Sequence, residues 1–253
     1  MSGFETVNYG KYDGIARVTL NRPQVLNRYN IKMRDELYEI LSAIRDDPDV
    51  QIVIINGSGE RAFCVGADLA EFGTAPSPII ARQVRWERDV WGLLGSLKQP
   101  LIAALHGYVL GSGVEIALLC DIRIASSDAV FGMPEVALGM IPAAGGSQTL
   151  PRNIGVGMAL HLLLSGEYID SELALRIGLV NKVVNREKLF SVAETIARDI
   201  KANDNAAVQC AKETVKRGRD LSLGQGLALE KRMAGSVRIL AGNESLIHGT
   251  VFT

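Results

Sequence analysis

Residues 101–125 read LIAALHGYVLGSGVEIALLCDIRIA, and this stretch decides the fold class. It begins with a bare apolar run at residues 101–105, which is typical of a strand buried on both faces of a parallel sheet. A short apolar helix at residues 113–120 and a second strand at residues 122–125 follow. Strand and helix alternate here as they do in right-handed crossovers between parallel strands, so the stretch predicts an α/β fold.

The segments on its amino-terminal side show the same two kinds of apolar spacing. Clustered β-branched and aromatic residues predict strands, and apolar residues three or four apart predict helices. In chain order, the predicted elements are a hairpin of residues 7–9 and 15–20, a helix capped by Asn30 and ending before Pro48, a buried strand at residues 52–55, and a long helix over residues 79–97. Strands are therefore expected in the first two thirds of the chain.

The last third is predicted to be almost entirely helical after about Ser171. Its clearest signal is an amphipathic stripe that starts at Leu189 and recurs at helical spacing to Ile200. No Pro/Gly/Ser-rich linker separates the two parts, so we expect the helical end to pack on the core or on a neighbouring subunit. We divide the chain into a core of residues 1–190 and a helical region of residues 191–253.

Composition excludes several classes of function. The 27 basic and 28 acidic residues leave a net charge of -1, which provides no general attraction to nucleic acid or to an anionic membrane. The three cysteines are widely spaced without a C-x-x-C motif, which argues against a disulfide framework or a zinc site and favours the cytoplasm. The amino terminus lacks a signal-peptide pattern, and no apolar run reaches the ~20 residues of a membrane span.

Other catalytic motifs are incomplete. The three histidines show no metal-ligand spacing, so no metal site is predicted. Ser112 does not stand in a G-x-S-x-G elbow, because Leu110 occupies the position of the first glycine. A hydrolase built on Ser112, His106 and Asp121 therefore remains only a minor alternative.

The glycine-rich segment Gly107–Gly113 joins the buried strand to the buried helix. Tight turning alone is one explanation of its glycines. The segment also leaves backbone N–H groups at a helix N-terminus, where they point at whatever binds there. It is a candidate site for an anion or an oxyanion.

Two acidic residues stand in apolar surroundings. Glu115 lies inside the predicted helix VEIALLC, and Glu135 lies in the segment FGMPEVALG. Glu115 in a structural salt bridge and Glu135 as an ordinary loop residue are the simpler interpretations. Burying an unpaired carboxylate is costly, however, and burial tunes a carboxyl group for proton transfer. Two such residues suggest an acid/base pair that holds one proton and one water.

Taken together, several motifs resemble the crotonase, or enoyl-CoA hydratase/isomerase, family. The resemblance runs from about residue 5 to residue 240. The motifs are Asn21-Arg22-Pro23 with Asn27, the sequence AFCVGADL at residues 62–69, His106-Gly107-Tyr108 through Glu115, Cys120-Asp121, FGMPE at residues 131–135, and residues 141–146. It implies a crotonase-like spiral of ββα units, a carboxy-terminal helical region that builds homotrimers, usually paired into hexamers, an acyl-CoA substrate, and no cofactor apart from the CoA of the substrate.

The resemblance also implies roles for individual residues. The backbone N–H groups of Ala67 and Ser112 would form the oxyanion hole for the thioester oxygen. Glu135 would exchange a proton with the α-carbon, and Glu115 would orient and activate water. The implied substrate-binding and CoA-binding residues are Ala62, Cys64, Ala67, Asp68, Leu69, Gly111, Ser112 and Arg28. Since both glutamates are present, the expected reaction is hydration of a 2-enoyl-CoA.

Departures from the family pattern leave the acyl group open. Ser112 replaces the usual glycine, and Ala70 and Glu71 stand where relatives often carry a CoA-binding lysine. Phosphate contacts would then come from Arg22 or Arg28. Trp86 and Trp91 lie on the segment that borders the acyl pocket in relatives, so we expect either an aromatic or alicyclic acyl group or plain core packing.

Three alternatives to hydration remain. The same scaffold supports double-bond isomerisation and other enolate reactions such as C–C cleavage. The family also includes RNA-binding relatives, which carry a lysine-rich helix. Residues 32–45 mix basic and acidic side chains instead, which argues against RNA binding.

Overall fold

The computed structural model describes residues 3–240. It begins with an antiparallel hairpin of β1 (Val7–Tyr12) and β2 (Ile15–Leu20), as predicted. The first strand is longer than expected, because the turn needs only two residues. Asp13 and Gly14 both have positive φ, at 49° and 73°, which is the backbone of the tight turns that join twisted strands.

Two sheets form the core, and each turn of the chain contributes one strand to each of them. The larger sheet has the spatial order β1, β2, β3 (Ile52–Gly57), β5 (Leu101–Leu105), β7 (Ile122–Ser126) and β10 (Lys182–Val184). The smaller has the order β4 (Ala62–Cys64), β6 (Tyr108–Leu110), β8 (Val130–Gly132) and β9 (Tyr168–Asp170). The pairs β3–β4, β5–β6 and β7–β8 are each followed by helices. This repetition is the predicted spiral of ββα units.

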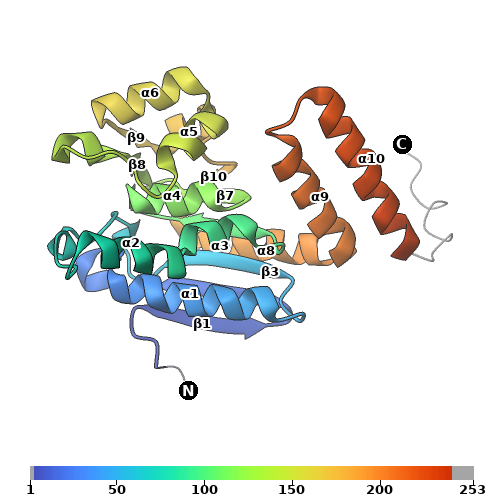
Figure 1. Cartoon of the computed structure of the whole chain (residues 1–253), viewed down its shortest axis with the longest axis horizontal. Coiled ribbons are helices and arrows are strands. Elements are labelled where there is room, and N and C mark those ends of the chain that lie inside the picture. Colours follow the sequence, from blue (N-terminus) through green and yellow to red (C-terminus); the bar gives the residue numbers. More distant parts are fainter. Residues whose placement is uncertain (1–2, 241–253) are drawn as a thin grey trace. The chain divides into compact units, whose positions relative to one another are not determined.

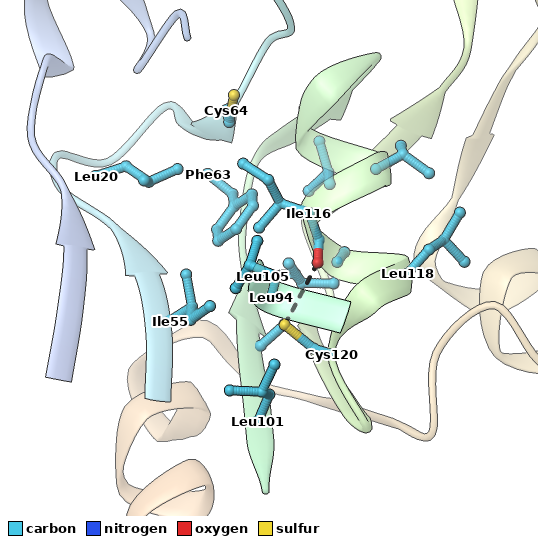
Figure 2. Packing of buried hydrophobic residues seen from close by; sticks show 14 of the residues in the cluster. Leu20, Ile55, Phe63, Cys64, Leu94, Leu101, Leu105, Ile116, Leu118 and Cys120 are labelled. Atoms are coloured by element: carbon cyan, nitrogen blue, oxygen red, sulfur yellow. Dashed lines mark hydrogen bonds between the residues drawn. The ribbon is translucent and has the colours of Figure 1, made fainter. Parts of the chain in front are cut away.

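Helices pack against the predicted strands. Helix α1 (Ile31–Asp46) begins at Asn30, whose side-chain oxygen accepts the N–H of Met33 at 2.9 Å, and lies along the larger sheet (Figure 1). Helix α4 (Ser112–Leu119) is buried along most of its length. Figure 2 shows its Ile116 packed among Phe63 of β4, Leu105 of β5 and Leu94, which lies in α3 (Val90–Ser96). The glycine-rich segment and Glu115 are therefore attached to the most buried helix of this core.

The predicted long helix over residues 79–97 is wrong. The structure has two helices there, α2 (Pro78–Glu87) and α3 (Val90–Ser96). Arg88 leaves the helical region with φ -123° and ψ 58°. Asp89 then caps the second helix, since its carboxylate accepts the N–H of Gly92 at 2.9 Å. A capping aspartate competes locally with helix continuation, and the apolar spacing did not reveal it.

The prediction that the chain is almost entirely helical after about Ser171 agrees with the described residues apart from one short strand. Strand β10 pairs in parallel with β7, after the short helix α7 (Ser171–Arg176). Three residues are too few to show a strand periodicity between helices. The strand forms because β7 otherwise presents an unpaired edge there.

The chain divides into two units, Met1–Asp199 and Ile200–Thr253, and the boundary lies inside α8 (Leu189–Lys201). The first unit contains both sheets. The second contains a helical pair, α9 (Asn205–Gly218) and α10 (Leu223–Leu240), in which the Cys210 thiol contacts the Met233 carbonyl oxygen at 3.4 Å. Within residues 3–240 we find no helix with the length and apolar character needed to cross a membrane.

A buried carboxylate ties the amino terminus to α1, and its removal tests this contact. Glu36 accepts the N–H groups of Glu5, Thr6 and Val7 and the Thr6 hydroxyl, at distances between 2.6 and 3.0 Å. Burial alone would raise the pKa of Glu36, but these hydrogen bonds outweigh it and hold the pKa below its ordinary 4.5. We expect Glu36→Gln to lower the free energy of unfolding by about 2 kcal/mol at neutral pH, because an amide nitrogen then faces backbone donors.

The pH dependence provides the check. A depressed carboxyl pKa stabilises the fold above the unfolded-state pKa, and the stabilisation is lost as pH falls through the folded-state value. Urea unfolding of both proteins at neutral pH and at about pH 3 should therefore show a difference that shrinks in acid. A difference independent of pH would contradict the role of the charged form.

Candidate active site

A cavity of about 1040 Å³ opens in the first unit, at the carboxyl ends of three neighbouring parallel strands. Its lining includes residues 65–69 after β4, residues 111–112 after β6, and six residues between 134 and 141 after β8. Open α/β sheets bind ligands at this edge, because loops and helix N-termini converge there. Residues near the start of α1 and from α2 and α3 complete the wall.

Ala67 and Ser112 both line this cavity. Tyr29 forms a parallel bridge to Ala67, in which it donates to the Gly66 carbonyl and accepts the Asp68 N–H. Because successive N–H groups of an extended strand point in opposite directions, the Ala67 N–H faces away from Tyr29. Ser112 is the first residue of α4, so its N–H lies among the donors of a helix N-terminus.

Gly66 brings these two segments into contact. Its φ is +96°, and a Cβ at this position would lie 3.4 Å from the Leu110 carbonyl oxygen and 3.7 Å from the Ser112 nitrogen. The positive φ favours glycine here, and the added Cβ would only reach ordinary van der Waals contact with these atoms. The structure brings the two predicted oxyanion donors to neighbouring strand ends.

Glu115 is almost completely buried, with 2% of its surface exposed. Its Oε1 accepts the N–H groups of Ala144 and Gly146, each at 2.9 Å. Gly146 begins helix α5 (Gly146–Ile154), so these donors belong to a helix N-terminus, which favours a negative charge. This loop was noted in the sequence only as a motif, and nothing in its spacing revealed that it holds Glu115.

Glu135 lies in the first turn of the 3-10 helix η3 (Pro134–Leu138) and lines the same cavity. Its buried Oε2 has no hydrogen-bond partner among the described residues. Burial raises the pKa of Glu135 above its ordinary 4.5, and the charge of Glu115 raises it further. The two predicted glutamates thus share one cavity, and Glu135 takes up a proton more readily than an ordinary carboxylate.

The other predicted binding residues fall into two groups. Asp68, Leu69 and Gly111 line the cavity. Ala62 and Cys64 are buried in β4 outside its lining, and Arg28 is exposed outside it. Burial raises the pKa of the Cys64 thiol to about 12, so this thiol is neutral.

The aromatic residues considered for the acyl pocket are separated by the break between α2 and α3. Trp91 lines the cavity and packs on Tyr29, with ring centroids 5.3 Å apart. Trp86 is 68% exposed, and the Arg82 guanidinium lies over its ring at 4.4 Å. Trp91 and Tyr29 therefore give the cavity an aromatic wall, whereas Trp86 packs neither in the cavity nor in the core.

The residues of the alternative hydrolase are not brought together. Ser112 lines the cavity, but His106 is buried outside its lining, and burial lowers the pKa of His106 to about 4. The Asp121 carboxylate accepts the Leu101 N–H at 2.8 Å. Within the described part of the chain, no group of three or more His, Cys, Asp or Glu residues could hold a metal ion.

Gly111 provides a direct test of the geometry around Glu135. Its φ is +51°, and a Cβ there would lie 3.0 Å from Glu135 Oε1. We expect Gly111→Ala to lower kcat about 100-fold, since a shift of about 1 Å in a reacting group has an effect of this size. Gly139→Ala controls for an added methyl group in the cavity, because Gly139 also lines it with positive φ but has nothing within 4 Å of the added Cβ. Equal activity losses in both variants would contradict the contact with Glu135.

Comparisons with known proteins agree with this fold. The family model described as enoyl-CoA hydratase/isomerase matches residues 10–242. A short-chain-enoyl-CoA hydratase from Clostridium acetobutylicum is 41% identical, over 87% of this chain and 85% of its own. A crotonyl-CoA hydratase from Syntrophomonas wolfei is 39% identical, over 90% and 87%. The crystal structure of an enoyl-CoA hydratase from Bacillus anthracis has a TM-score of 0.88 and 36% identity, over 92% of this chain and 91% of that one.

A spiral α/β core with a two-glutamate cavity at its strand ends thus defines the class of protein. The chain belongs to the enoyl-CoA hydratase/isomerase, or crotonase, family.

Proposed function

We propose that this protein is an enoyl-CoA hydratase, which adds water across the 2,3 double bond of an acyl-CoA thioester. One observation carries the proposal: Glu115, Glu135 and the oxyanion donors Ala67 and Ser112 line a single cavity. The hydratases among the relatives support the same reaction.

The thioester oxygen would accept the N–H groups of Ala67 and Ser112. Negative charge develops on this oxygen when the β-carbon is attacked, and preorganised donors stabilise it. Loss of one such donor typically costs about 3 kcal/mol of transition-state stabilisation. The Ser112 side chain would narrow the pocket relative to a glycine without removing the backbone donor.

The two glutamates would divide the proton transfers. Glu115, held by the Ala144 and Gly146 amides, orients a water and accepts its proton as the oxygen bonds to the β-carbon. Glu135 in its protonated form gives a proton to the α-carbon, which converts the enolate to the thioester of a 3-hydroxy acid. The raised pKa of Glu135 supports this assignment. The two acids thus exchange protonation states during one turnover, and a proton returns from Glu115 to Glu135 through solvent.

CoA would enter only as part of the substrate, without another cofactor. Leu69 lines the cavity and would contact the substrate. The buried Ala62 and Cys64 would act indirectly, because they belong to the strand that leads to Ala67. The exposed Arg28 is the better candidate for a CoA phosphate, because the Arg22 guanidinium is already engaged by Asp68 at 3.0 Å. Tyr29 and Trp91 would border the acyl group.

Residues 191–253 would form the region through which subunits assemble into a homotrimer or a hexamer, with residues 1–190 as the catalytic core. Exposed apolar side chains on α9 and α10 support this, among them Val215, Leu223 and Leu227. We place the protein in the cytoplasm, which its three free cysteines support. Light scattering of the full chain in solution tests the assembly.

The proposed activity is tested with a panel of 2-enoyl-CoAs. We expect the absorbance of the conjugated thioester to fall, and the product to gain one water. Incubation with a 3-enoyl-CoA in ¹⁸O-labelled water, followed by mass analysis, separates the nearest alternative, because isomerisation alone incorporates no label. Label-free 2-enoyl product without hydration of any panel member would contradict the proposal.

A further inference from the structure

The segment that carries Ala67 is held against a second segment by a short parallel bridge. Tyr29 donates to the Gly66 carbonyl at 2.9 Å, and its own carbonyl accepts the Asp68 N–H at 2.8 Å. These two hydrogen bonds flank Ala67 and set the plane in which its N–H points. Any group that fixes both sides of this bridge therefore fixes the direction of the Ala67 N–H.

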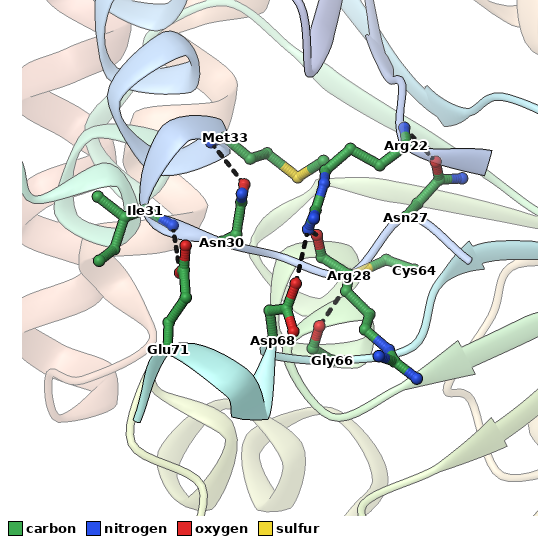
Figure 3. Close-up of polar contacts among 10 residues, drawn as sticks. All are labelled: Arg22, Asn27, Arg28, Asn30, Ile31, Met33, Cys64, Gly66, Asp68 and Glu71. Carbon is green, nitrogen blue, oxygen red and sulfur yellow. Dashed lines mark hydrogen bonds and ion pairs between the residues drawn. The ribbon is translucent and has the colours of Figure 1, made fainter. Parts of the chain in front are cut away.

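Arg22 is such a group. Its Nη1 donates to the Arg28 carbonyl at 2.8 Å, next to Tyr29, and to Asp68 Oδ2 at 3.0 Å, next to Ala67. Figure 3 shows the guanidinium placed between the two segments, with the Arg28 side chain directed away from Asp68. The Arg22 and Asp68 side chains are only 17% and 12% exposed, so water screens their interaction less than in a surface ion pair.

Asn27 anchors the other end of Arg22. Its side chain is fully buried, its oxygen accepts the Arg22 N–H at 2.8 Å, and its nitrogen donates to the Ser58 and Ala62 carbonyls, both at 2.9 Å. The backbone of Asn27 has a φ of +55°, a conformation that asparagine adopts more readily than most residues. Arg22 is thus fixed to the start of β4, the strand that leads to Ala67.

These contacts leave Arg22 and Asp68 poorly suited to the binding of CoA. The Arg22 guanidinium faces a carboxylate, which compensates its charge, and a free Asp68 carboxylate would repel a phosphate. Their mutual contact at the bridge explains both side chains without a ligand. The same contacts connect three sequence motifs, Asn21-Arg22-Pro23, Asn27 and Gly-Ala-Asp, into one structural cluster.

We propose that Arg22, Asn27 and Asp68 are positioning residues that aim the Ala67 N–H into the oxyanion hole. The proposal rests on the proposed function in one respect, namely that the Ala67 N–H donates to the thioester oxygen. The ion pair acts on the transition state through the Ala67 N–H and not by contact with the reacting atoms. Its loss lets the bridge rotate, so the donor remains present but is misdirected.

The test combines kinetics with a spectroscopic readout of the oxyanion hole. The variants are Arg22→Met, Asp68→Asn and the double variant, with cinnamoyl-CoA as the probe. When the thioester oxygen accepts strong hydrogen bonds, the conjugated system is polarised and its absorbance moves to longer wavelength. We expect each single variant to lower kcat about 10- to 100-fold and to reduce this shift, while the KM changes little. The double variant should lose little more than either single one, because the residues act as a pair.

Two controls keep the outcomes distinct. Lys11→Met removes the 2.7 Å ion pair between Lys11 of the exposed hairpin and Asp47. It should leave kcat and the absorbance shift of the bound probe unchanged. Asp68→Asn is isosteric but removes the charge that pairs with Arg22, so it remains informative if Arg22→Met fails to fold. A full absorbance shift and kcat in Asp68→Asn would overturn the proposal, as would a raised KM with unchanged kcat in Arg22→Met, which indicates phosphate binding. The shift needs only ligand binding, so a bound probe tests the positioning even if the protein proves not to be a hydratase.

Discussion

Replacement of Glu135 by glutamine is expected to lower kcat for hydration by about 10²- to 10⁴-fold, the usual contribution of a general acid or base. The amide keeps the size of the side chain but has no proton to give to the α-carbon. Glu135 accepts no hydrogen bond at its buried Oε2, so the fold loses no contact there. Steady-state hydration of a 2-enoyl-CoA measures the loss.

A second measurement isolates the step. A saturated acyl-CoA cannot be hydrated, but its α-protons exchange with deuterium oxide if a base in the site removes them. We expect this exchange to disappear in Glu135→Gln. The exposed Glu167, which pairs with His161, provides the matched control, and Glu167→Gln should retain both activities. Exchange at the normal rate in Glu135→Gln would contradict its role at the α-carbon.

Glu115→Gln is expected to reduce hydration to a similar extent, again about 10²- to 10⁴-fold, because the site loses the base that activates water. The side-chain oxygen can still accept the Ala144 and Gly146 amides, so Glu115→Gln should keep the loop in place. In contrast to Glu135→Gln, it should retain α-proton exchange of the saturated acyl-CoA, since no water is attacked in that reaction. Unchanged hydration in Glu115→Gln would contradict the two-carboxylate mechanism.

The pH dependence of the residual hydration rate of Glu115→Gln provides a further test. Burial and the charge of Glu115 both raise the pKa of Glu135. Hydration needs protonated Glu135, so the rate falls as pH rises through that pKa. Removing the charge of Glu115 lowers the pKa of Glu135, and the basic limb of the pH–rate profile should move to lower pH. A limb that stays in place would show that the two carboxyl groups do not interact.

The position of both catalytic candidates was predictable because an acid in an apolar segment is rare and costly. The parallel core was predictable for a similar reason, since continuous β-branched runs such as β3 have few alternatives to a doubly buried strand. Capping by Asn30 is a local interaction and was visible in the sequence. The break at Arg88 and Asp89 was missed, although it is local, because the apolar spacing continues across it.

Contacts between distant segments could not be predicted in this way. Glu115 is held by amides about 30 positions further along the chain, and Arg22 reaches Asp68 across 46 positions. The sequence does not distinguish these contacting groups from others of the same kind, since every residue except proline has a backbone N–H and arginine is common on surfaces. Arg22 consequently appeared to be available for a CoA phosphate.

The sequence by itself determined that this chain folds as an α/β spiral of the crotonase type, and that Glu115 and Glu135 are its candidate acids. These features follow from side-chain polarity along the chain and from motifs in a fixed order. Only the tertiary structure decided how the candidate site is assembled: which amides hold Glu115, what raises the pKa of Glu135, and which contacts surround Ala67. Burial, electrostatic coupling and hydrogen-bond direction depend on segments brought together by the two sheets, so they have no signal in the order of residues alone.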